Sequence, residues 1–420
     1  MTPFLLVRRS LSQHALSSTV TVLAVALACG LVMSVFAIND QTRDAFTGGE
    51  TGFDAVLGAR GSQLQLVLNT VFHLETSPGN LPWSLYEAIR EHPAVELAIP
   101  YATGDNYRGY RLVGTSEELF ARFEYRKGRK FAVAPGGRIF DSNFREAVIG
   151  SFAAEKTGLT VGSKFNPYHG LTFDETQRHE EEYLVVGVLE PTNSPSDRVI
   201  WIPIEGIFRL GGHVLRGTGQ QEYEAERGKP IPDEHKEVSA VMLKFREGSA
   251  MAGFQLNQDI NLRGKEATLA WPIGRVMADL FNKMGWISRV LELVAYLVVA
   301  VASGAILASI YNTMNERRRE FAILRALGAR RTTVFSTIVL EAATIAFTGA
   351  LLGYLVYAVI LAATTMILRA QTGVVLDVFA LHPVLWITPV GMTILGALSG
   401  VLPAAKAYST DVAESLVPHS

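Results

Sequence analysis

Few residues of this sequence have the types and spacing that catalysis or nucleotide binding requires. The string from Gly158 to Lys164 approaches a phosphate-binding G-x-x-x-x-G-K-[ST] loop, but its glycines and lysine are wrongly spaced. His179 precedes three glutamates without a second histidine, so the H-E-x-x-H zinc motif is absent, as is a G-x-S-x-G nucleophile elbow. The histidines are scattered, at 14, 73, 92, 169, 179, 213, 235, 382 and 419. We therefore expect no catalytic residue, no metal site and no cofactor in this chain.

A basic segment at residues 314–331 has the most distinctive pattern. At 100° per residue, one arc of about 160° collects four apolar side chains, Phe321, Ile323, Leu324 and Leu327. The other side carries Arg318, Ala322, Arg325 and Ala326, and Gly328 ends the helix. Such a helix can lie on the membrane surface with its arginines near anionic lipid, or it can dock into a cytoplasmic partner.

Four apolar segments must position these residues. A membrane span needs about 20 apolar residues, because its backbone polar groups must pair within the helix. Runs without Asp, Glu, Lys or Arg lie between residues 9 and 40, 292 and 316, 341 and 369, and 377 and 406. Around these runs we predict spans at 18–38, 287–313, 333–368 and 384–405. The first also resembles a signal peptide after Arg8 and Arg9, but its apolar core exceeds the usual length of about 7–15 residues, which favours a retained anchor.

The composition agrees with a mixture of spans and a large aqueous part. The chain has 420 residues, 49% hydrophobic and 19% charged, whereas a soluble protein carries about 25% charged residues. A net charge of −2 gives no basic field for nucleic acid. The single cysteine, Cys29, excludes a disulfide framework and a cysteine-ligated zinc site.

Lysine and arginine residues in short loops predict the orientation. Six arginines lie in segment 314–331, Arg8 and Arg9 lie in segment 1–17, and Lys406 begins the tail 406–420. These segments share one side of the membrane, so we predict that both termini are cytoplasmic. Residues 39–285 then form one extracytoplasmic domain, and 369–383 form a short outer loop.

The sequence therefore predicts a membrane protein of four transmembrane α-helices, with a large α+β domain inserted between the first two. We expect strands at Val95–Pro100, Ala147–Ile149, Tyr183–Leu189, Val199–Pro203 and Ser239–Phe245. We expect helices at Pro82–Glu91, Ser116–Phe123, Phe152–Thr157 and Ser249–Leu262. Two polar stretches, 170–182 and 211–237, are typical of surface loops.

The basic segment resembles the signature of MacB/FtsX-type ABC transporter permeases, which runs roughly R-x-R-E-I-G-I-L-R-A-L-G-A. The matching residues are Arg317, Arg319, Glu320, Ile323, Leu324, Arg325, Ala326, Leu327, Gly328 and Ala329. Phe321 and Ala322 replace the usual isoleucine and glycine. Glu341 with Gly349 and Gly353, and the ending Gly400 to Pro403, are similar to other family stretches. The tail at 411–416 lacks the family's proline.

The resemblance implies a non-catalytic permease subunit of the mechanotransmission type in the bacterial inner membrane. A separate dimeric ATPase would bind ATP and Mg²⁺ and drive the outer domain to export or extract a lipoprotein, peptide or amphiphile. The implied partners also include a second permease chain, as a homodimer, a periplasmic adaptor or substrate-binding lipoprotein, and membrane lipids, but no nucleic acid. The implied ATPase-docking coupling helix comprises Glu316, Arg317, Arg318, Arg319, Glu320, Phe321, Ile323, Leu324, Arg325, Leu327 and Gly328.

Two other functions remain as alternatives. A signalling subunit could activate an outer partner such as a cell-wall hydrolase, although such relatives usually have a small outer domain. A membrane-anchored enzyme is disfavoured by the missing catalytic motifs.

Three further features have two interpretations each. Glu341, an ionisable residue within a span, either has a structural contact or handles substrate or protons. Gly349 and Gly353 permit close helix packing, within the subunit or against a second permease, and we also assign Gly400 and Pro403 to helix packing. The segment 58–72 either packs into the outer domain or forms a gate or lipid-facing groove.

Overall fold

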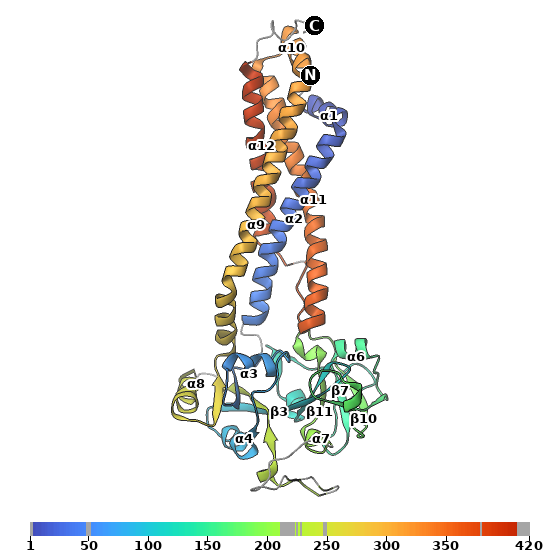
Figure 1. Cartoon of the computed structure of the whole chain (residues 1–420), viewed down its shortest axis with the longest axis vertical. Coiled ribbons are helices and arrows are strands. Elements are labelled where there is room, and N and C mark those ends of the chain that lie inside the picture. The colour runs from blue at the N-terminus through green and yellow to red at the C-terminus, as the bar shows by residue number, and fades with distance from the viewer. Residues whose placement is uncertain are drawn as a thin grey trace. The chain divides into compact units, whose positions relative to one another are not determined.

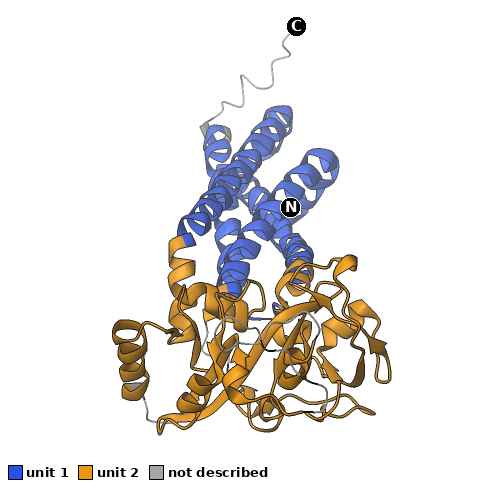
Figure 2. Cartoon of the chain, turned by 60° about the horizontal axis from the view of Figure 1, so that its bottom comes forward, with its two compact units in different colours: residues 1–42, 284–365, 376–420 blue, residues 43–283, 366–375 orange. Residues whose placement is uncertain are grey.

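The computed structural model describes residues 3–47, 52–210, 223, 226, 229–246, 250–378 and 380–409. They form two compact units, shown in blue and orange in Figure 2. The first unit holds residues 1–42, 284–365 and 376–420, and the second holds residues 43–283 and 366–375. The tail motif at 411–416 and most of the polar stretch 211–237 lie outside the described residues.

The first unit is helical (Figure 1). Its helices are α1 Pro3–Gln13, α2 Ala15–Thr47, α9 Ile273–Glu316, α10 Arg318–Ala326, α11 Arg331–Thr372 and α12 Val384–Ser409, of which α2, α9 and α11 continue into residues of the second unit. Four of them, α2, α9, α11 and α12, are long and apolar enough to cross a membrane. Each contains one of the predicted spans, so the prediction of four transmembrane helices is confirmed.

Glycines let these helices approach one another closely. A Cβ on Gly349 of α11 would lie 2.6 Å from the Cβ of Val25 on α2, and a Cβ on Gly353 would lie 2.7 Å from that of Cys29. A Cβ on Gly400 of α12 would lie 2.8 Å from the Cβ of Ala342 on α11. The small residues therefore pack helices within this subunit, the first of the two interpretations. Pro403 lies inside α12.

The second unit is built on a mixed ten-stranded sheet with the order β14-β1-β13-β3-β4-β11-β7-β10-β8, to which β9 adds by pairing with β3. Its strands are β1 Ala55–Ala59, β3 Val95–Tyr107, β4 Tyr110–Thr115, β7 Glu146–Ile149, β8 Lys164–Phe165, β9 Tyr168–His169, β10 Tyr183–Val188, β11 Ile200–Pro203, β13 Ala240–Phe245 and β14 Ala267–Ala270. Two short pairs lie apart from it, β2 Leu81–Pro82 with β12 Glu237–Val238 and β5 Glu124–Arg126 with β6 Arg129–Lys130.

The sheet is buried on both faces. Along β13, Val241 and Leu243 enter one hydrophobic cluster while Ala240 and Met242 enter the other, because successive side chains of a strand point to opposite faces. Short helices cover these faces: α3 Gln63–Thr70, α4 Trp83–Arg90, α5 Glu118–Ala121, α6 Ser151–Thr157, α7 Ile204–Phe208 and α8 Ala250–Asn257. Four 3₁₀ or π-helical turns, Glu175–Gln177, Pro195–Arg198, Asp233–His235 and Gln258–Arg263, complete the unit. The predicted α+β class is confirmed.

All five expected strands lie on strands of the sheet, β3, β7, β10, β11 and β13. The expected helices correspond to α4, α5, α6 and α8, but α5 is only four residues long and α8 gives way to a π-helical turn at Gln258–Arg263. The strands β1, β4 and β14 were not predicted.

The end of α11 differs from the expected boundary at residue 368. The helix continues to Thr372, and residues 366–375 group with the second unit. Gly373 follows the helix with φ +78°, and a Cβ there would lie 2.6 Å from the backbone oxygen of Ser194. Glycine suits this position because the left-handed conformation and the close approach both disfavour a side chain.

Candidate functional site

A buried ion pair fixes the start of the basic segment. Arg317 stands between α9 and α10, at the N-cap position of α10. Its Nη1 lies 3.4 Å from Oε2 of Glu341 on α11, and the two residues are only 6% and 4% exposed. Ser10 of α1 lies between them: its hydroxyl accepts a hydrogen bond from Arg317 and donates one to Glu341, each 2.5 Å long. Three helices therefore meet at one buried charge pair.

Arg317 also holds the first turn of α10. Its Nε donates a hydrogen bond to Glu320 at 3.1 Å. Its guanidinium lies over the ring of Phe321, 4.9 Å from the centroid, in the stacking geometry that arginine favours. Because Nη1 contacts Ser10 and Glu341 while Nε and the guanidinium plane contact residues of α10, the orientation of α10 is tied to that of α11. This geometry favours the structural interpretation of Glu341.

The predicted coupling residues divide between two faces of α10: an inner face, which is buried against the helical unit, and an outer face, which is exposed. Phe321 and Ala322 are buried, whereas Ile323 is 45% and Leu327 81% exposed. The four residues of the apolar arc thus do not share one environment, and Ala322, expected on the opposite side, packs inward beside Phe321. Leu324 and Arg325 are half-buried, and the exposed residues are Glu316, Arg318, Arg319, Glu320 and Gly328.

A groove of about 450 Å³ lies beside α10, and the buried Phe321 forms part of its lining. Its walls include Leu6, Leu324, Leu327 and Val334. Gly328 follows α10 with φ +95°, as expected just past a helix C-terminus. The described part of the segment thus presents an apolar, arginine-flanked surface.

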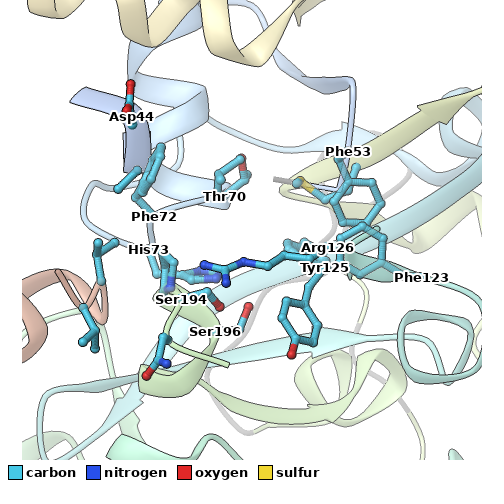
Figure 3. A pocket seen from close by; sticks show the side chains of 18 residues that line it. Asp44, Phe53, Thr70, Phe72, His73, Phe123, Tyr125, Arg126, Ser194 and Ser196 are labelled. Carbon is cyan, nitrogen blue, oxygen red and sulfur yellow. The ribbon is translucent and has the colours of Figure 1, made fainter. Parts of the chain in front are cut away.

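The second unit contains a separate pocket of about 560 Å³ (Figure 3). Aromatic side chains form much of its wall, among them Phe53, Phe72, Tyr101, Phe123 and Tyr125. Seven of the 18 lining residues are polar or charged: Asp44, Thr70, His73, Arg126, Asn193, Ser194 and Ser196. An apolar wall with a few polar groups is the usual composition of a small-molecule site.

His73 is the most perturbed of these polar groups. Burial, followed by the charges of Arg111 and Arg198, lowers the pKa of His73 to about 3. The imidazole is therefore neutral at physiological pH, and its Nδ1 has no hydrogen-bond partner among the described residues. A neutral ring can offer a donor or an acceptor to a ligand in the pocket.

The segment 58–72 supplies both core and pocket. Leu66 and Val67 of α3 are fully buried in one of the two hydrophobic clusters of the sheet, so the packing interpretation is confirmed. Phe72 at its end lines the pocket together with Thr70. The sequence did not indicate this pocket, because its walls come from eight separate stretches of chain between residues 44 and 375.

The sequence also missed a cluster of possible metal ligands. Asp105, His169 and His179 each place one ligand atom within 4.8 Å of the other two. The scattered histidine positions predicted no such group, because only the pairing of β9 with β3 brings His169 opposite Asp105.

Two families match the chain. Residues 18–256 match the MacB-like periplasmic core domain, and residues 292–412 match the FtsX-like permease C-terminal domain. The first match alone covers more than half of the chain. The chain belongs to the MacB/FtsX-type permease family. Its four apolar helices and this family make it a transmembrane subunit of the ABC-transporter type, in the inner membrane.

Curated relatives agree with the family. The Macrolide export ATP-binding/permease protein MacB of Escherichia coli K12 is 26% identical over 291 residues, which cover 63% of this chain and 43% of the relative. The MacB protein of Bordetella avium is 21% identical over 433 residues, which cover 97% of this chain and 58% of the relative. The chain thus spans about half the length of these relatives.

Two solved structures were also matched. The periplasmic region of MacB from Actinobacillus actinomycetemcomitans has 13% identity and a TM-score of 0.33, covering 56% of this chain and 94% of that one. The extracellular domain of the transporter YknZ from Gram-positive bacteria has 17% identity and a TM-score of 0.29. This match covers 51% of this chain and 97% of the YknZ domain.

Proposed function

We propose that this chain couples ATP hydrolysis in a separate, dimeric ATPase to movement of its outer domain, and so exports or extracts a substrate. The observation that carries the proposal is the buried pair of Arg317 and Glu341, which ties α10 to a transmembrane helix. A helix that only rested on lipid would need no such fixed orientation. In this proposal the ATPase binds ATP and Mg²⁺, and this chain has no catalytic residue.

The outer face of α10 is the proposed docking surface. Leu327 and Ile323 expose apolar side chains beside the exposed arginines Arg318 and Arg319. Apolar anchors surrounded by charged groups are typical of protein interfaces. Phe321, which is buried, contributes by packing α10 onto the bundle rather than by contacting the ATPase.

The helix α11 is the proposed transmitting element. Near one end it carries Glu341, the partner of Arg317. Near the other end it carries Arg369, which lies 3.4 Å from Glu155 and 5.1 Å from the ring centroid of Phe152. Both contacts belong to one continuous helix, so a displacement of α10 would act on the outer domain through α11.

The lining of the pocket in the second unit supports the proposal that the substrate is an amphiphile. Its aromatic wall suits an apolar body, and His73 and Ser194 suit a few polar groups (Figure 3). The Escherichia coli relative is named for macrolide export, and macrolides are amphiphiles. A lipid-modified protein segment or a peptide belongs to the same chemical class.

Further parts of the proposal concern topology and partners. Both termini would be cytoplasmic, because the arginine-rich segment and Arg8 and Arg9 would then lie on the inner side. Two copies of the chain would stand over one ATPase dimer. A periplasmic adaptor or substrate-binding lipoprotein would complete the assembly.

Co-purification from the native membrane tests the proposal. We expect the tagged chain to retain an ATPase subunit, and Leu327→Asp or Ile323→Asp to release it, since both side chains are exposed and neither change disturbs the core. Val161→Asp, an exposed apolar position on the outer domain, is the matched control and should retain the ATPase. Undiminished ATPase recovery with both docking variants would refute the coupling role. Recovery of a hydrolase in place of any ATPase would favour a signalling subunit.

A further inference from the structure

Two strands and a loop of the outer domain bring three metal-ligand side chains together. Asp105 lies on β3, and His169 lies directly opposite it on β9 in the antiparallel register. His179 follows the 3₁₀ turn Glu175–Gln177. Its Nε2 lies 3.1 Å from Oδ1 of Asp105, and Nδ1 of His169 lies 3.5 Å from the same oxygen.

We propose that Asp105, His169 and His179 form a binding site for a divalent transition metal, with zinc as the best-fitting ion. Zinc binds imidazole nitrogen and carboxylate oxygen at about 2.0–2.2 Å, so neighbouring ligand atoms of a tetrahedron lie about 3.4 Å apart. The two distances to Asp105 Oδ1 fall close to this edge length. Two imidazoles and one carboxylate are also a donor set that hard cations such as Mg²⁺ disfavour.

The burial of the three side chains suits a site with one open position. Asp105 is fully buried and His179 is 9% exposed, whereas the side chain of His169 is 48% exposed. A buried carboxylate facing two imidazoles is stabilised by a cation. Three protein ligands leave the fourth tetrahedral position to water on the exposed side of His169.

Neighbouring hydrogen bonds fix the backbone beside the two histidines without a metal. The side-chain amide of Asn106 donates to the backbone oxygens of Gly170 at 2.9 Å and Thr172 at 3.2 Å. The backbone nitrogen of His179 donates to the oxygen of Pro167 at 2.9 Å. A fixed backbone reduces the reorganisation that metal binding requires of its ligands. A bound ion would therefore pin the polar stretch 170–182 to the sheet.

Metal titration of the full-length chain in detergent micelles tests the site. The protein should carry an affinity tag without histidines and be stripped with a chelator before the titration. We expect one zinc per chain after dialysis, and we expect Co²⁺ to give the intense visible absorption of a tetrahedral site. Because the assay needs no ATPase, its outcome does not depend on the proposed coupling function.

Variants separate this site from adventitious binding by other histidines. His169→Gln changes a half-exposed side chain, so the fold should persist, and zinc affinity should fall at least about 100-fold. Asp105→Asn should have the same effect, and His92→Gln, a half-buried histidine of another loop, is the matched control. Binding that survives His169→Gln unchanged would show only adventitious metal and overturn the proposal. A parent chain that binds no zinc would overturn it too, and would leave the cluster as contacts between two histidines and a carboxylate.

Discussion

The buried pair of Arg317 and Glu341 makes a quantitative prediction for the stability of the helical unit. Glu341→Gln removes one charge and leaves the buried guanidinium of Arg317 with Glu320 as its remaining carboxylate partner. Removing one partner of a buried pair costs about 3–5 kcal/mol. Arg317 keeps its hydrogen bonds to Glu320 and Ser10, so we expect the lower end of this range, about 3 kcal/mol.

The single cysteine provides the assay. Cys29 is fully buried on α2, facing Gly353 of α11, so a thiol-reactive dye reaches it only when the helices separate. For units of about 150–250 residues, 1 kcal/mol shifts the Tm by about 2–4 °C, so Glu341→Gln should lower the Tm by about 6–12 °C. A Cys29→Ala chain should give no signal and serves as the blank.

A double-mutant cycle identifies the partner. Adding Arg317→Gln to Glu341→Gln removes both charges, so the double variant should lose less stability than the sum of the single variants, by at least about 1 kcal/mol. Glu316→Gln is the matched control, since this exposed residue pairs with His14 at 3.2 Å and surface pairs contribute under about 1 kcal/mol. A Tm within 1 °C of the parent for Glu341→Gln, or strict additivity, would refute the reasoning.

Two further predictions concern packing and pH. Gly349→Val places a methyl-bearing carbon against Val25, so overpacking should cost about 1–3 kcal/mol of stability and lower the Tm in the Cys29 assay. Gly391→Ala is the control and should change the Tm little, because no atom lies within 4 Å of the added Cβ. Equal Tm shifts would contradict close packing of α2 and α11. Because the pKa of His73 is lowered from 6.5 to about 3, the unfolded chain binds a proton that the folded chain does not between these pH values. The stability of the outer domain, followed by tryptophan fluorescence, should therefore fall as pH drops below about 6.5. The fall should exceed that of the His73→Phe variant by up to about 1.4 kcal/mol per pH unit. Parallel stability–pH profiles of the parent and the variant would exclude this linkage.

The spans were predictable because hydrophobic length is a local property of the sequence. Runs without charge located all four transmembrane helices, and the family resemblance singled out the segment that contains α10. Apolar periodicity alone placed Ile323 on the apolar arc and Ala322 on the opposite side. Tertiary packing instead buries Ala322 and exposes Ile323.

The missed features depend on contacts between distant residues. Ser10 and Glu341 are 331 positions apart, so no local pattern could pair them. The short strands β1, β4 and β14 are defined by their neighbours in the sheet rather than by their own sequence. The cluster of Asp105, His169 and His179 arises from strand pairing, which spacing along the chain does not reveal.

Chemical crosslinking from position 327 tests the coupling role of α10 most directly. In a Cys29→Ala background, Leu327→Cys would carry a short cysteine–amine crosslinker in native membranes, with Val161→Cys as the control. We predict that position 327 crosslinks to an ATPase chain and that ATP changes the yield, while position 161 gives no such product. Failure of position 327 to capture an ATPase, under conditions in which the ATPase co-purifies, would contradict docking through α10.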